Sequence, residues 1–404
     1  MYKEYTLGEI VEEIIDYRGK TPKKLGGDWN DESTGYRALS AKNIKNGMIV
    51  QPETIRYVNE DLYKKWMKQE VEKGMIFITS EAPFGELLYW DSDEKIVLSQ
   101  RLFGLKIKSD FNSKYIFYYM FGNEFQSELR GRATGSTVTG LRQPELLKCK
   151  IMVPDRKVQD YIADTLYNVD KKMQNNNDII NNLYDLSNKI FEKKILLNEK
   201  VEKEEFNLSQ LCEIANGYSY KGTELNDESN VGMATIKNFE RTGGFKVDGF
   251  KGVVPEKAKD NHFVELYDIL VACTDLTQNA DIIGNPIMLL NKSNYEKIIM
   301  SMDLVKIIPN EKLIDKYILF SILNSQIFKN YALGYKSGTT VLHLNKNCFS
   351  NFKISIPKKE LLIDIADCIK NNFLKIGQLI TENSSLEILK QDLIQKLINN
   401  EYSL

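Results

Sequence analysis

The stretch RGRATGSTVTGLR, residues 130–142, decides how this chain is organised, because it returns as YKSGTTVLHLNK at residues 335–346. Each copy leads into an apolar run that ends in proline, at Pro154 or Pro357, and then into a long helical pattern. The loops, the prolines and the helical patterns all stand 203 residues apart. A spacing kept over tens of residues indicates an internal duplication.

The two loops share a chemistry. Neither contains an acidic residue, although the formal net charge of the whole chain is only −2. Positive charge comes from Arg130, Arg132 and Arg142 in the first copy and from Lys336 and Lys346 in the second. Glycine lets backbone N–H groups approach a ligand closely, and hydroxyl groups can reach phosphates or base edges. The pattern favours an anionic ligand; the alternative is a pair of ordinary turns whose basic residues are simply solvated.

Length and composition limit the class of protein. A chain of 404 residues is too long for one ordinary core, and two repeats of about 200 residues fit the usual domain size. Five scattered cysteines and two histidines make a structural zinc site improbable. There is no run of 18 apolar residues and no signal-peptide pattern, so we expect a cytoplasmic protein without a membrane contact. With a nearly balanced charge, nucleic-acid binding would have to come from local patches.

Two segments carry the heptad pattern of a coiled coil over five heptads each. The predicted seam steps by alternating four and three residues through Ile162, Leu166, Met173, Ile180, Leu183 and Ile190, continuing to Lys194 and Leu197, and through Ile365, Ile369, Ile376, Leu386 and Leu393. Polar seam residues Asn176, Asn383 and Lys390 would cost stability but fix the register. Because neither helix can bury its stripe alone, we expect the two helices to pair. The alternative is that each helix packs only on its own globular domain.

These features predict an α+β chain with two duplicated globular domains, residues 1–156 and 202–357, and two long spacer helices, residues 157–201 and 358–404. If the helices form an antiparallel coiled coil, the globular domains lie at opposite ends of a rod and the two basic loops face one side. Such a body could meet two separated half-sites on duplex DNA and leave the bases between them unread. Because the two domains differ in sequence, the half-sites should differ too.

The turn RGKTP at residues 18–22, with NIKNG at residues 43–47, resembles the specificity subunits of type I restriction-modification enzymes. So do the two glycine-hydroxyl loops, each placed before a proline-ended strand and a long helix, and the resemblance covers essentially the whole chain. It implies a non-catalytic subunit whose two target-recognition domains read a bipartite, asymmetric site on double-stranded DNA. The second loop departs from the first, because Lys336 stands in a segment with fewer arginines.

The same resemblance implies partners and cofactors. Two methylation subunits, which bind S-adenosylmethionine, would grip the antiparallel spacer helices. Restriction subunits, which use ATP and Mg²⁺, would be recruited in turn. No cofactor would be bound by this chain itself.

The candidate DNA-contacting residues come from the basic turns, the strand ends and the two loops. In the first repeat they are Arg18, Lys20, Lys23, Lys42, Asn43, Ser80, Arg130, Arg132, Ser136, Thr137 and Arg142. In the second repeat they are Lys221, Lys237, Asn238, Thr274, Lys336, Thr339, Thr340, His343 and Lys346.

Catalytic alternatives find little support in the sequence. A phosphate-binding loop ending at Gly19-Lys20-Thr21 would need a glycine where Ile14 stands. An amino-methyltransferase would need an Asn/Asp-Pro-Pro-aromatic motif, which residues 285–287 do not provide. A nuclease reading of Asp185, Glu192 and Lys194 places them on a long helix, where exposed charges are ordinary. Two hypotheses remain: a DNA-sequence reader that organises other subunits, or a duplicated scaffold that binds only proteins through its coiled coil.

Overall fold

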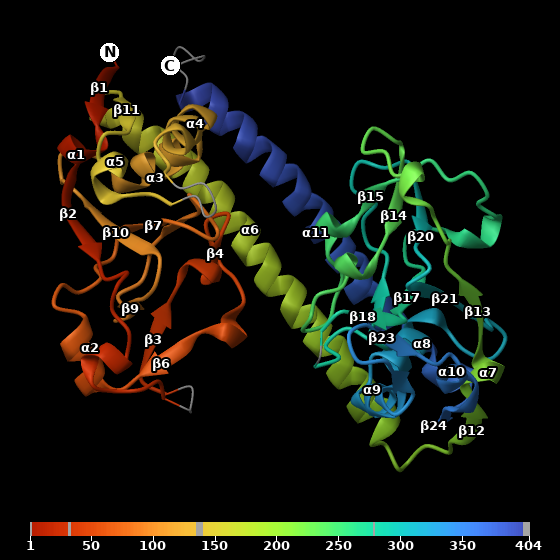
Figure 1. Ribbon diagram of the computed structural model, residues 1–404. Coiled ribbons are helices and arrows are strands. Elements are labelled where there is room, and N and C mark those ends of the chain that lie inside the picture. The colour runs from red at the N-terminus through yellow and green to blue at the C-terminus, as the bar shows by residue number, and fades with distance from the viewer. Residues whose placement is uncertain (1, 31–33, 135–139, 278, 399–404) are drawn as a thin grey trace. The chain divides into compact units, whose positions relative to one another are not determined.

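The computed structural model describes residues 2–30, 34–134, 140–277 and 279–398, and the chain divides into two compact units (Figure 1). Unit 1 comprises residues 1–172 together with 386–404, and unit 2 comprises residues 173–385. Each unit therefore holds one copy of the repeat and a part of each long helix. These units divide within the long helices, whereas the segments expected from the sequence divide at the helix ends.

Unit 1 begins with a short strand and a capped helical turn. Its strands are β1 (Lys3–Thr6), β2 (Val11–Asp16), β3 (Tyr36–Leu39), β4 (Ile44–Lys45), β5 (Met48–Ile49), β6 (Arg56–Val58), β7 (Ile76–Thr79), β8 (Leu87–Tyr89), β9 (Val97–Leu98), β10 (Leu102–Ile107) and β11 (Lys150–Val153). Its helices are α1 (Leu7–Ile10), α2 (Glu60–Trp66), α3 (Ser113–Phe121), α4 (Asn123–Gly131), α5 (Gln143–Leu146) and the first part of α6 (Arg156–Phe191).

The central sheet of unit 1 has the strand order β2-β10-β7-β8 and is covered on both faces. Strand β7 shows this directly: Ile76 and Ile78 face a core shared with α3 and α4, while Phe77 faces the core of the second sheet, β6-β3-β9. Side chains of a strand alternate between faces, so a strand buried throughout must lie between two apolar layers. Unit 1 is thus built as helices, central sheet and second sheet.

Unit 2 repeats this plan. Its strands are β12 (Glu204–Asn207), β13 (Cys212–Asn216), β14 (Val231–Ala234), β15 (Lys251–Gly252), β16 (Phe263–Val264), β17 (Ile269–Ala272), β18 (Thr274–Asp275), β19 (Pro286–Met288), β20 (Lys297–Met300), β21 (Leu304–Pro309), β22 (Lys336–Ser337), β23 (Leu342–Leu344) and β24 (Lys353–Ile356). Its helices are α7 (Leu208–Leu211), α8 (Lys316–Leu323), α9 (Gln326–Leu333), α10 (Asn347–Asn351) and most of α11 (Ile363–Ile398).

The topology of the two units confirms the duplication. The central sheet β13-β21-β17-β19 repeats the order β2-β10-β7-β8, and the pair β12-β24 repeats β1-β11. The second sheets also agree, since β14 pairs with β20 in parallel as β3 pairs with β9. Even the entry turns match: Thr6 and Glu9 form a capping box in α1, and Asn207 and Gln210 form one in α7.

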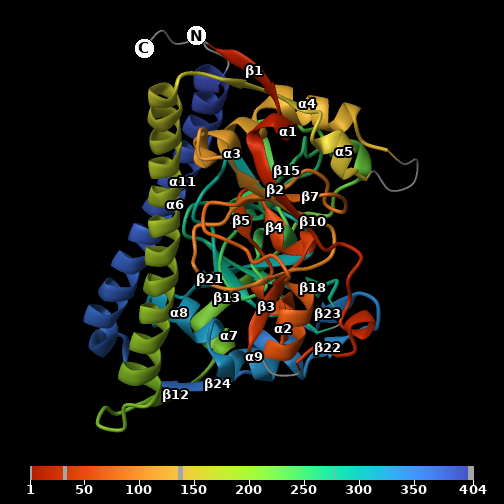
Figure 2. The ribbon, with the colours of Figure 1, turned by 90° about the vertical axis from the view of Figure 1, so that its left-hand side faces the viewer.

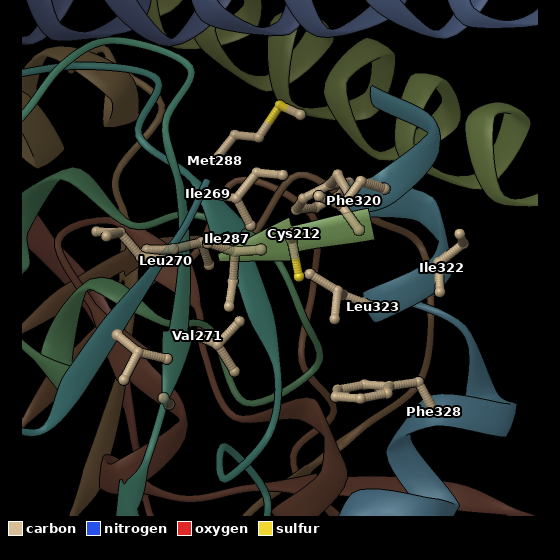
Figure 3. Packing of buried hydrophobic residues seen from close by; sticks show 14 of the residues in the cluster. Cys212, Ile269, Leu270, Val271, Ile287, Met288, Phe320, Ile322, Leu323 and Phe328 are labelled. Atoms are coloured by element: carbon tan, nitrogen blue, oxygen red, sulfur yellow. The ribbon is translucent and has the colours of Figure 1, made fainter. Parts of the chain in front are cut away.

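The core of unit 2 lies between its central sheet and the helices that follow it. In Figure 3, Phe320 and Leu323 of α8 and Phe328 of α9 point toward the apolar side chains of β17 and β19, among them Val271 and Ile287. All five of these side chains are at most 3 % exposed. Helix α8 is fixed at its start by Asp315, whose side chain accepts a hydrogen bond from the Tyr317 N–H.

The apolar spacing of residues 7–15 predicts a short amphipathic helix, and the structure contains only its first turn. Residues 7–15 form one helical turn, α1, and then the strand β2. The β-branched residues Val11, Ile14 and Ile15 favour an extended backbone, and β2 gains a ladder of hydrogen bonds with β10. The expectation of an amphipathic helix here was wrong, because pairing in the sheet overrides a short helical period.

Helices α6 and α11, each 36 residues long, lie side by side and antiparallel (Figures 1 and 2). In unit 2, Asn176 contacts Asn383, and Ser187 contacts Asn372. Moving forward along α6 therefore means moving backward along α11. The expected α+β fold with duplicated domains and an antiparallel coiled coil is confirmed.

The long helices pack against each other and also against the globular parts of their units. Ile162 and Leu166 at the start of α6 lie in the core of unit 1, and Ile365 and Ile369 at the start of α11 lie in or against the core of unit 2. In unit 2 the ring of Phe373 on α11 takes part in both contacts. It lies 5.4 Å from the Tyr184 ring of α6 and 4.9 Å from the Phe320 ring of α8, measured between centroids. Further along, the predicted seam residues Met173, Ile180, Leu183, Ile190, Ile376, Leu386 and Leu393 are buried or half-buried.

The prediction that Lys194 and Leu197 continue the first helical seam was wrong. The α-helix ends at Phe191 and continues as a π-helical turn, Glu192–Leu196. A π turn takes up an extra residue and rotates the buried stripe. Ile195 is therefore fully buried in place of Lys194, and Leu197 is 66 % exposed.

Polar residues of the seam are paired. In unit 2 the Asn176 side chain is fully buried, and its Nδ2 donates hydrogen bonds to Asn383 Oδ1 at 2.8 Å and to Glu382 Oε2 at 2.9 Å. In unit 1 the ammonium group of Lys390 is buried and lies 2.7 Å from Asp170 Oδ1. The other Asp170 oxygen accepts a hydrogen bond from the Tyr118 hydroxyl at 2.7 Å. Each unit thus fixes the helix register with its own polar contacts.

Candidate nucleic-acid interface

The two repeated loops close in the same way. In unit 1, Thr134 and Gly140 exchange two backbone hydrogen bonds of 2.9 Å. In unit 2, Ser337 and His343 form the equivalent pair between β22 and β23, again 203 residues further along. At the turn of this second loop, Gly338 has φ +101°, and a Cβ there would lie only 2.2 Å from the Val341 carbonyl oxygen. The glycine is required by the sharpness of the turn.

A short ladder attaches each loop to the central sheet. In unit 1 the Leu141 N–H donates to the Ser80 carbonyl, and the Ser80 N–H donates to the Arg101 carbonyl. In unit 2 the Leu344 N–H donates to the Cys273 carbonyl, and the Cys273 N–H donates to the Asp303 carbonyl. The loop, the end of a central strand and the turn before β10 or β21 are therefore neighbours in both units.

Beside this ladder, unit 1 has a hollow of about 670 Å³. Five cationic side chains line it together with a single acid, Asp28; the cations are Lys20, Lys23, Lys42, Arg56 and Arg101. Trp29, Trp66 and several hydroxyl residues complete the lining. A concave surface lined mainly by cations concentrates positive potential and suits a phosphate backbone.

The hollow brings together three of the predicted residues. Lys23 and Lys42 are exposed. Lys20 is half-buried: its Nζ donates to the Trp66 carbonyl at 2.6 Å and lies 3.8 Å from the centre of the Tyr17 ring. Burial, and secondarily the nearby Lys68 charge, lower the pKa of Lys20 below its usual value. Lys20 therefore shapes the wall of the hollow, while Lys23 and Lys42 are available to a ligand.

Arg56 and Arg101 were missed from the sequence. Arg56 lies over the Trp29 ring at 5.4 Å, and Arg101 pairs with Glu81 at 3.3 Å. Neither lies in the repeated loop or in a basic run. The one available signal was the position of Arg101, a charged residue in the short gap between two apolar strands.

Four predicted contacts have structural roles instead, and we remove them from the interface. Asn43 and Asn238 are fully buried at equivalent places. Asn43 Oδ1 accepts hydrogen bonds from the Ser40 N–H and hydroxyl, and Asn238 Oδ1 accepts one from the Thr235 N–H. Both amides close a 3₁₀ turn of the second sheet, so they cannot reach a ligand.

The other two of these four are Ser80 and Thr274. Both are buried, and the Thr274 hydroxyl donates to Asp303 at 2.7 Å. Strand-end hydroxyls were expected to face DNA, but the ladder between loop and sheet covers them.

Two arginines of the prediction are half-buried and held by acids. Arg18 forms an ion pair with Asp16 at 2.8 Å, donates to the Leu141 carbonyl, and lies over the Phe103 ring at 3.9 Å. Arg132 pairs with Glu128 at 2.8 Å, and this hydrogen bond raises the pKa of Arg132. Their charges are largely compensated within the fold, which corrects their expected role as primary DNA contacts.

Of the remaining predicted residues, eight lie on the surface. Arg130, Arg142, Lys237, Lys336, Thr339, Thr340 and His343 are exposed, as is Lys221, which lies 3.8 Å from Glu256. Lys346 is half-buried, and its Nζ donates to Asn216 Oδ1. Ser136 and Thr137 lie outside the described residues. Arg130 and Arg142 of the first loop and Lys336 of the second are exposed, so both repeats have basic residues accessible beside their ladders.

Replacement of Asn43 by alanine separates a structural role from a binding role. Because the change removes a fully buried amide that bonds to half-buried Ser40 and Thr54, we expect the free energy of unfolding to fall by about 1–3 kcal/mol. The exposed neighbour Lys42 is the control: Lys42→Ala should change stability by less than about 0.5 kcal/mol and weaken DNA binding. Urea denaturation and binding titrations measure both. The reverse pattern would return Asn43 to the interface.

Next to the second loop, the half-buried side chain of Lys329 holds a neighbouring segment. Its Nζ donates to the carbonyls of Ala280 and Ile283 at 3.2 and 2.6 Å, while fully buried Asp275 accepts the N–H groups of Ile282 and Ile283. Burial lowers the pKa of Lys329 from its usual 10.5 to about 8, although nearby Asp275 opposes the shift.

This shift predicts a pH dependence. Between pH 8 and 10.5 the unfolded chain still carries the Lys329 proton and the folded chain has released it, so the contribution of Lys329 to stability rises with pH across this window. We expect wild type to gain stability relative to Lys329→Met from pH 8 to 10.5. Taking the difference cancels the tyrosines and cysteines that titrate in the same range. If the difference in unfolding free energy between wild type and Lys329→Met does not change with pH, the lowered pKa of Lys329 is contradicted.

Within the described part of the chain, no three His, Cys, Asp or Glu side chains gather where they could hold a metal ion. The five cysteines are free, and only Cys368 is exposed. None of the helices among residues 2–30, 34–134, 140–277 and 279–398 has the length and apolar character needed to cross a membrane.

Comparison with known proteins places this geometry in context. The family model of the type I restriction modification DNA specificity domain matches the chain twice, at residues 1–184 and 200–385. The two matches coincide with the two repeats.

Individual relatives are distant. The specificity subunit of the type I restriction enzyme MjaVIII from Methanocaldococcus jannaschii is 25 % identical over 184 residues, which are 43 % of this chain and 43 % of that protein. Among solved structures, the S subunit of the type I restriction-modification system from M. genitalium is similar with a TM-score of 0.58 and 16 % identity, covering 98 % of this chain and 96 % of that chain. At this identity the likeness establishes a shared fold.

Proposed function

The chain belongs to the type I restriction modification DNA specificity family, and from this premise we propose that it is the sequence-reading subunit of such an enzyme. The observation that carries the proposal is that the family domain occurs twice, at residues 1–184 and 200–385. Each domain would read one part of a bipartite, asymmetric site on double-stranded DNA. The cation-lined hollow of unit 1 and the exposed basic loop of unit 2 support contacts to phosphates.

We further propose that this chain organises a larger enzyme. Two methylation subunits would hold the paired long helices, and restriction subunits would join them. In support, both helices expose large apolar side chains, including Tyr161 at 52 %, Leu186 at 46 % and Ile388 at 70 %. Contiguous exposed apolar patches mark surfaces for protein partners, and we propose that these side chains contribute to such a patch.

In this role the chain itself is non-catalytic and binds no cofactor. S-adenosylmethionine would be held by the methylation subunits, and ATP and Mg²⁺ by the restriction subunits. The complex would act on DNA in the cytoplasm.

A competition experiment tests the DNA-reading role. The chain assembled with its methylation subunit is titrated onto a labelled duplex carrying its site, at about 0.15 M salt, against unlabelled duplexes in which one half, the other half or the spacer is scrambled. Specific binding typically exceeds non-specific binding by at least a thousandfold. We expect scrambling either half to remove most of the competition, and scrambling the spacer to have little effect. Equal competition by all duplexes would favour the alternative of a protein-binding scaffold.

A further inference from the structure

We propose that one two-residue turn, present in both units but different in sequence, determines which bases each domain prefers. The turn is Gln100-Arg101 between β9 and β10 in unit 1, and Met302-Asp303 between β20 and β21 in unit 2. The inference rests on the proposed DNA-reading function and names the residues that would give the two domains different preferences.

Equivalent backbone hydrogen bonds flank the turn in both units. Before it, the Ser99 N–H donates to the Leu39 carbonyl at 2.8 Å, and the Ser301 N–H donates to the Ala234 carbonyl at 2.9 Å. At its end, the Arg101 carbonyl accepts the Ser80 N–H at 2.8 Å, and the Asp303 carbonyl accepts the Cys273 N–H at 2.7 Å. Equivalent hydrogen bonds at both ends place Gln100 opposite Met302 and Arg101 opposite Asp303.

Burial singles out the two central positions. The flanking residues are Leu98, Ser99 and Leu102 in unit 1 and Met300, Ser301 and Leu304 in unit 2, and none is more than 4 % exposed. Met302 is 56 % exposed, the Arg101 side chain is 47 % exposed, Gln100 is exposed and Asp303 is half-buried. The scaffold is therefore fixed, and only the tip is free to vary without repacking the core.

The second unit shows how tightly the turn is held. Gly217 passes so close that a Cβ there would lie 1.9 Å from the Ser301 carbonyl oxygen. The Gly217 N–H also donates to the Leu304 carbonyl, and the Tyr218 N–H donates to the Met300 carbonyl. A tip on so rigid a support presents its side chains in a defined direction, as base recognition requires.

In unit 1 the tip lies within the candidate interface. Gln100 and Arg101 line the same hollow as Lys23, Lys42 and Arg56. Lysines and arginines at the rim of such a hollow suit phosphate oxygens, which position DNA without reading it. The tip is hydrogen-bonded through Ser80 to Leu141 at the end of the repeated loop, so base-reading groups and basic groups lie close together.

The side chains at the two tips recognise different base edges. Arginine pairs with guanine O6 and N7, and glutamine pairs with adenine N6 and N7. Aspartate accepts from the cytosine amino group, and an apolar side chain contacts the thymine methyl. A carboxylate repels phosphate, so Asp303 is not suited to contact the sugar-phosphate backbone of DNA. The exchange of Gln-Arg for Met-Asp at equivalent places in the two units is a change of base preference.

Neighbouring groups orient both charged side chains. Arg101 lies 3.3 Å from Glu81, and Asp303 accepts the Thr274 hydroxyl at 2.7 Å. Arg101 is also the one residue among the four tip positions with a positive φ, 66°. That conformation is costly for arginine and easy for glycine, so an arginine there points to a use for its side chain.

This conformation supplies a variant that keeps the fold. Arg101→Gly removes the side chain and also removes the backbone strain of a positive φ, so the melting temperature of this variant should not fall below that of wild type. Asp303→Ala is the counterpart in unit 2, and Lys23→Ala, in the same hollow as Arg101, is the control. The methylated sites of host DNA are determined by single-molecule sequencing after co-expression of each chain with its methylation subunit.

We expect Arg101→Gly to relax one position in one half of the site, with discrimination there falling about tenfold to a hundredfold. Asp303→Ala should relax one position in the other half, and Lys23→Ala should lower methylation evenly without changing the site. A bipartite wild-type site that both variants leave intact would overturn the assignment of the turn alone. Wild type that methylates no defined site would overturn the DNA-reading function, and this inference with it.

Discussion

Replacing Lys23, Lys42 and Arg56 together by alanine is expected to weaken DNA binding by the assembled complex about a hundredfold at 0.15 M salt. All three line the unit 1 hollow, and Lys23 and Lys42 are exposed. If each neutralises one phosphate, the salt dependence of log K should become shallower by about three. Fluorescence anisotropy at salt concentrations from about 0.05 to about 0.3 M measures both quantities.

A triple variant with the same loss of charge is the control. Lys3, Lys108 and Lys157 are exposed residues of unit 1 that do not line the hollow. Their replacement should leave the salt dependence nearly unchanged. Equal effects of the two triple variants would mean that net charge alone attracts DNA, and the hollow would lose its place as the interface.

The second large effect is on stability. Lys390→Ala removes the partner of Asp170 within the paired helices of unit 1, and we expect the free energy of unfolding of that unit to fall by about 3 kcal/mol. Breaking a buried pair from one side leaves an uncompensated charge. Asp170 keeps the Tyr118 hydroxyl and is 30 % exposed, which holds the cost at the lower end of the usual range.

The double variant Asp170→Asn with Lys390→Met tests the cause. It removes both charges at similar volume, so most of the lost stability should return. Hydrogen exchange of α6 and α11 amides would report the loss and the recovery locally. A double variant no more stable than Lys390→Ala would show that the loss came from packing of the lysine chain, not from the unpaired carboxylate.

Much of the fold could be predicted because the repeat encodes it twice. Local sequence patterns gave the offset of 203 residues, the proline-ended strands and the heptads. The matching strand orders of the two units and the antiparallel long helices agree with these patterns. Where pattern failed, a competing interaction prevailed. Residues 11–16 pair in a sheet, and one π turn exchanges Lys194 for Ile195 on the buried face.

The interface was harder to predict, because it depends on residues that are distant in sequence. Residue type suggested Asn43 and Thr274, but the fold uses the Asn43 amide to close a turn and the Thr274 hydroxyl to hold Asp303. Arg56 and Arg101 carry no motif, and only the folding of their strands brings them to one hollow. The difference between Gln100-Arg101 and Met302-Asp303 becomes visible once hydrogen bonds align the two units.

Two copies of one scaffold with different tips should read two unlike stretches of DNA. Single-molecule sequencing of DNA methylated by the wild-type chain with its methylation subunit measures this most directly. We predict one site with two specified parts of different sequence, separated by a fixed number of unspecified base pairs. A single continuous site, two identical parts, or methylation without any defined site would contradict it.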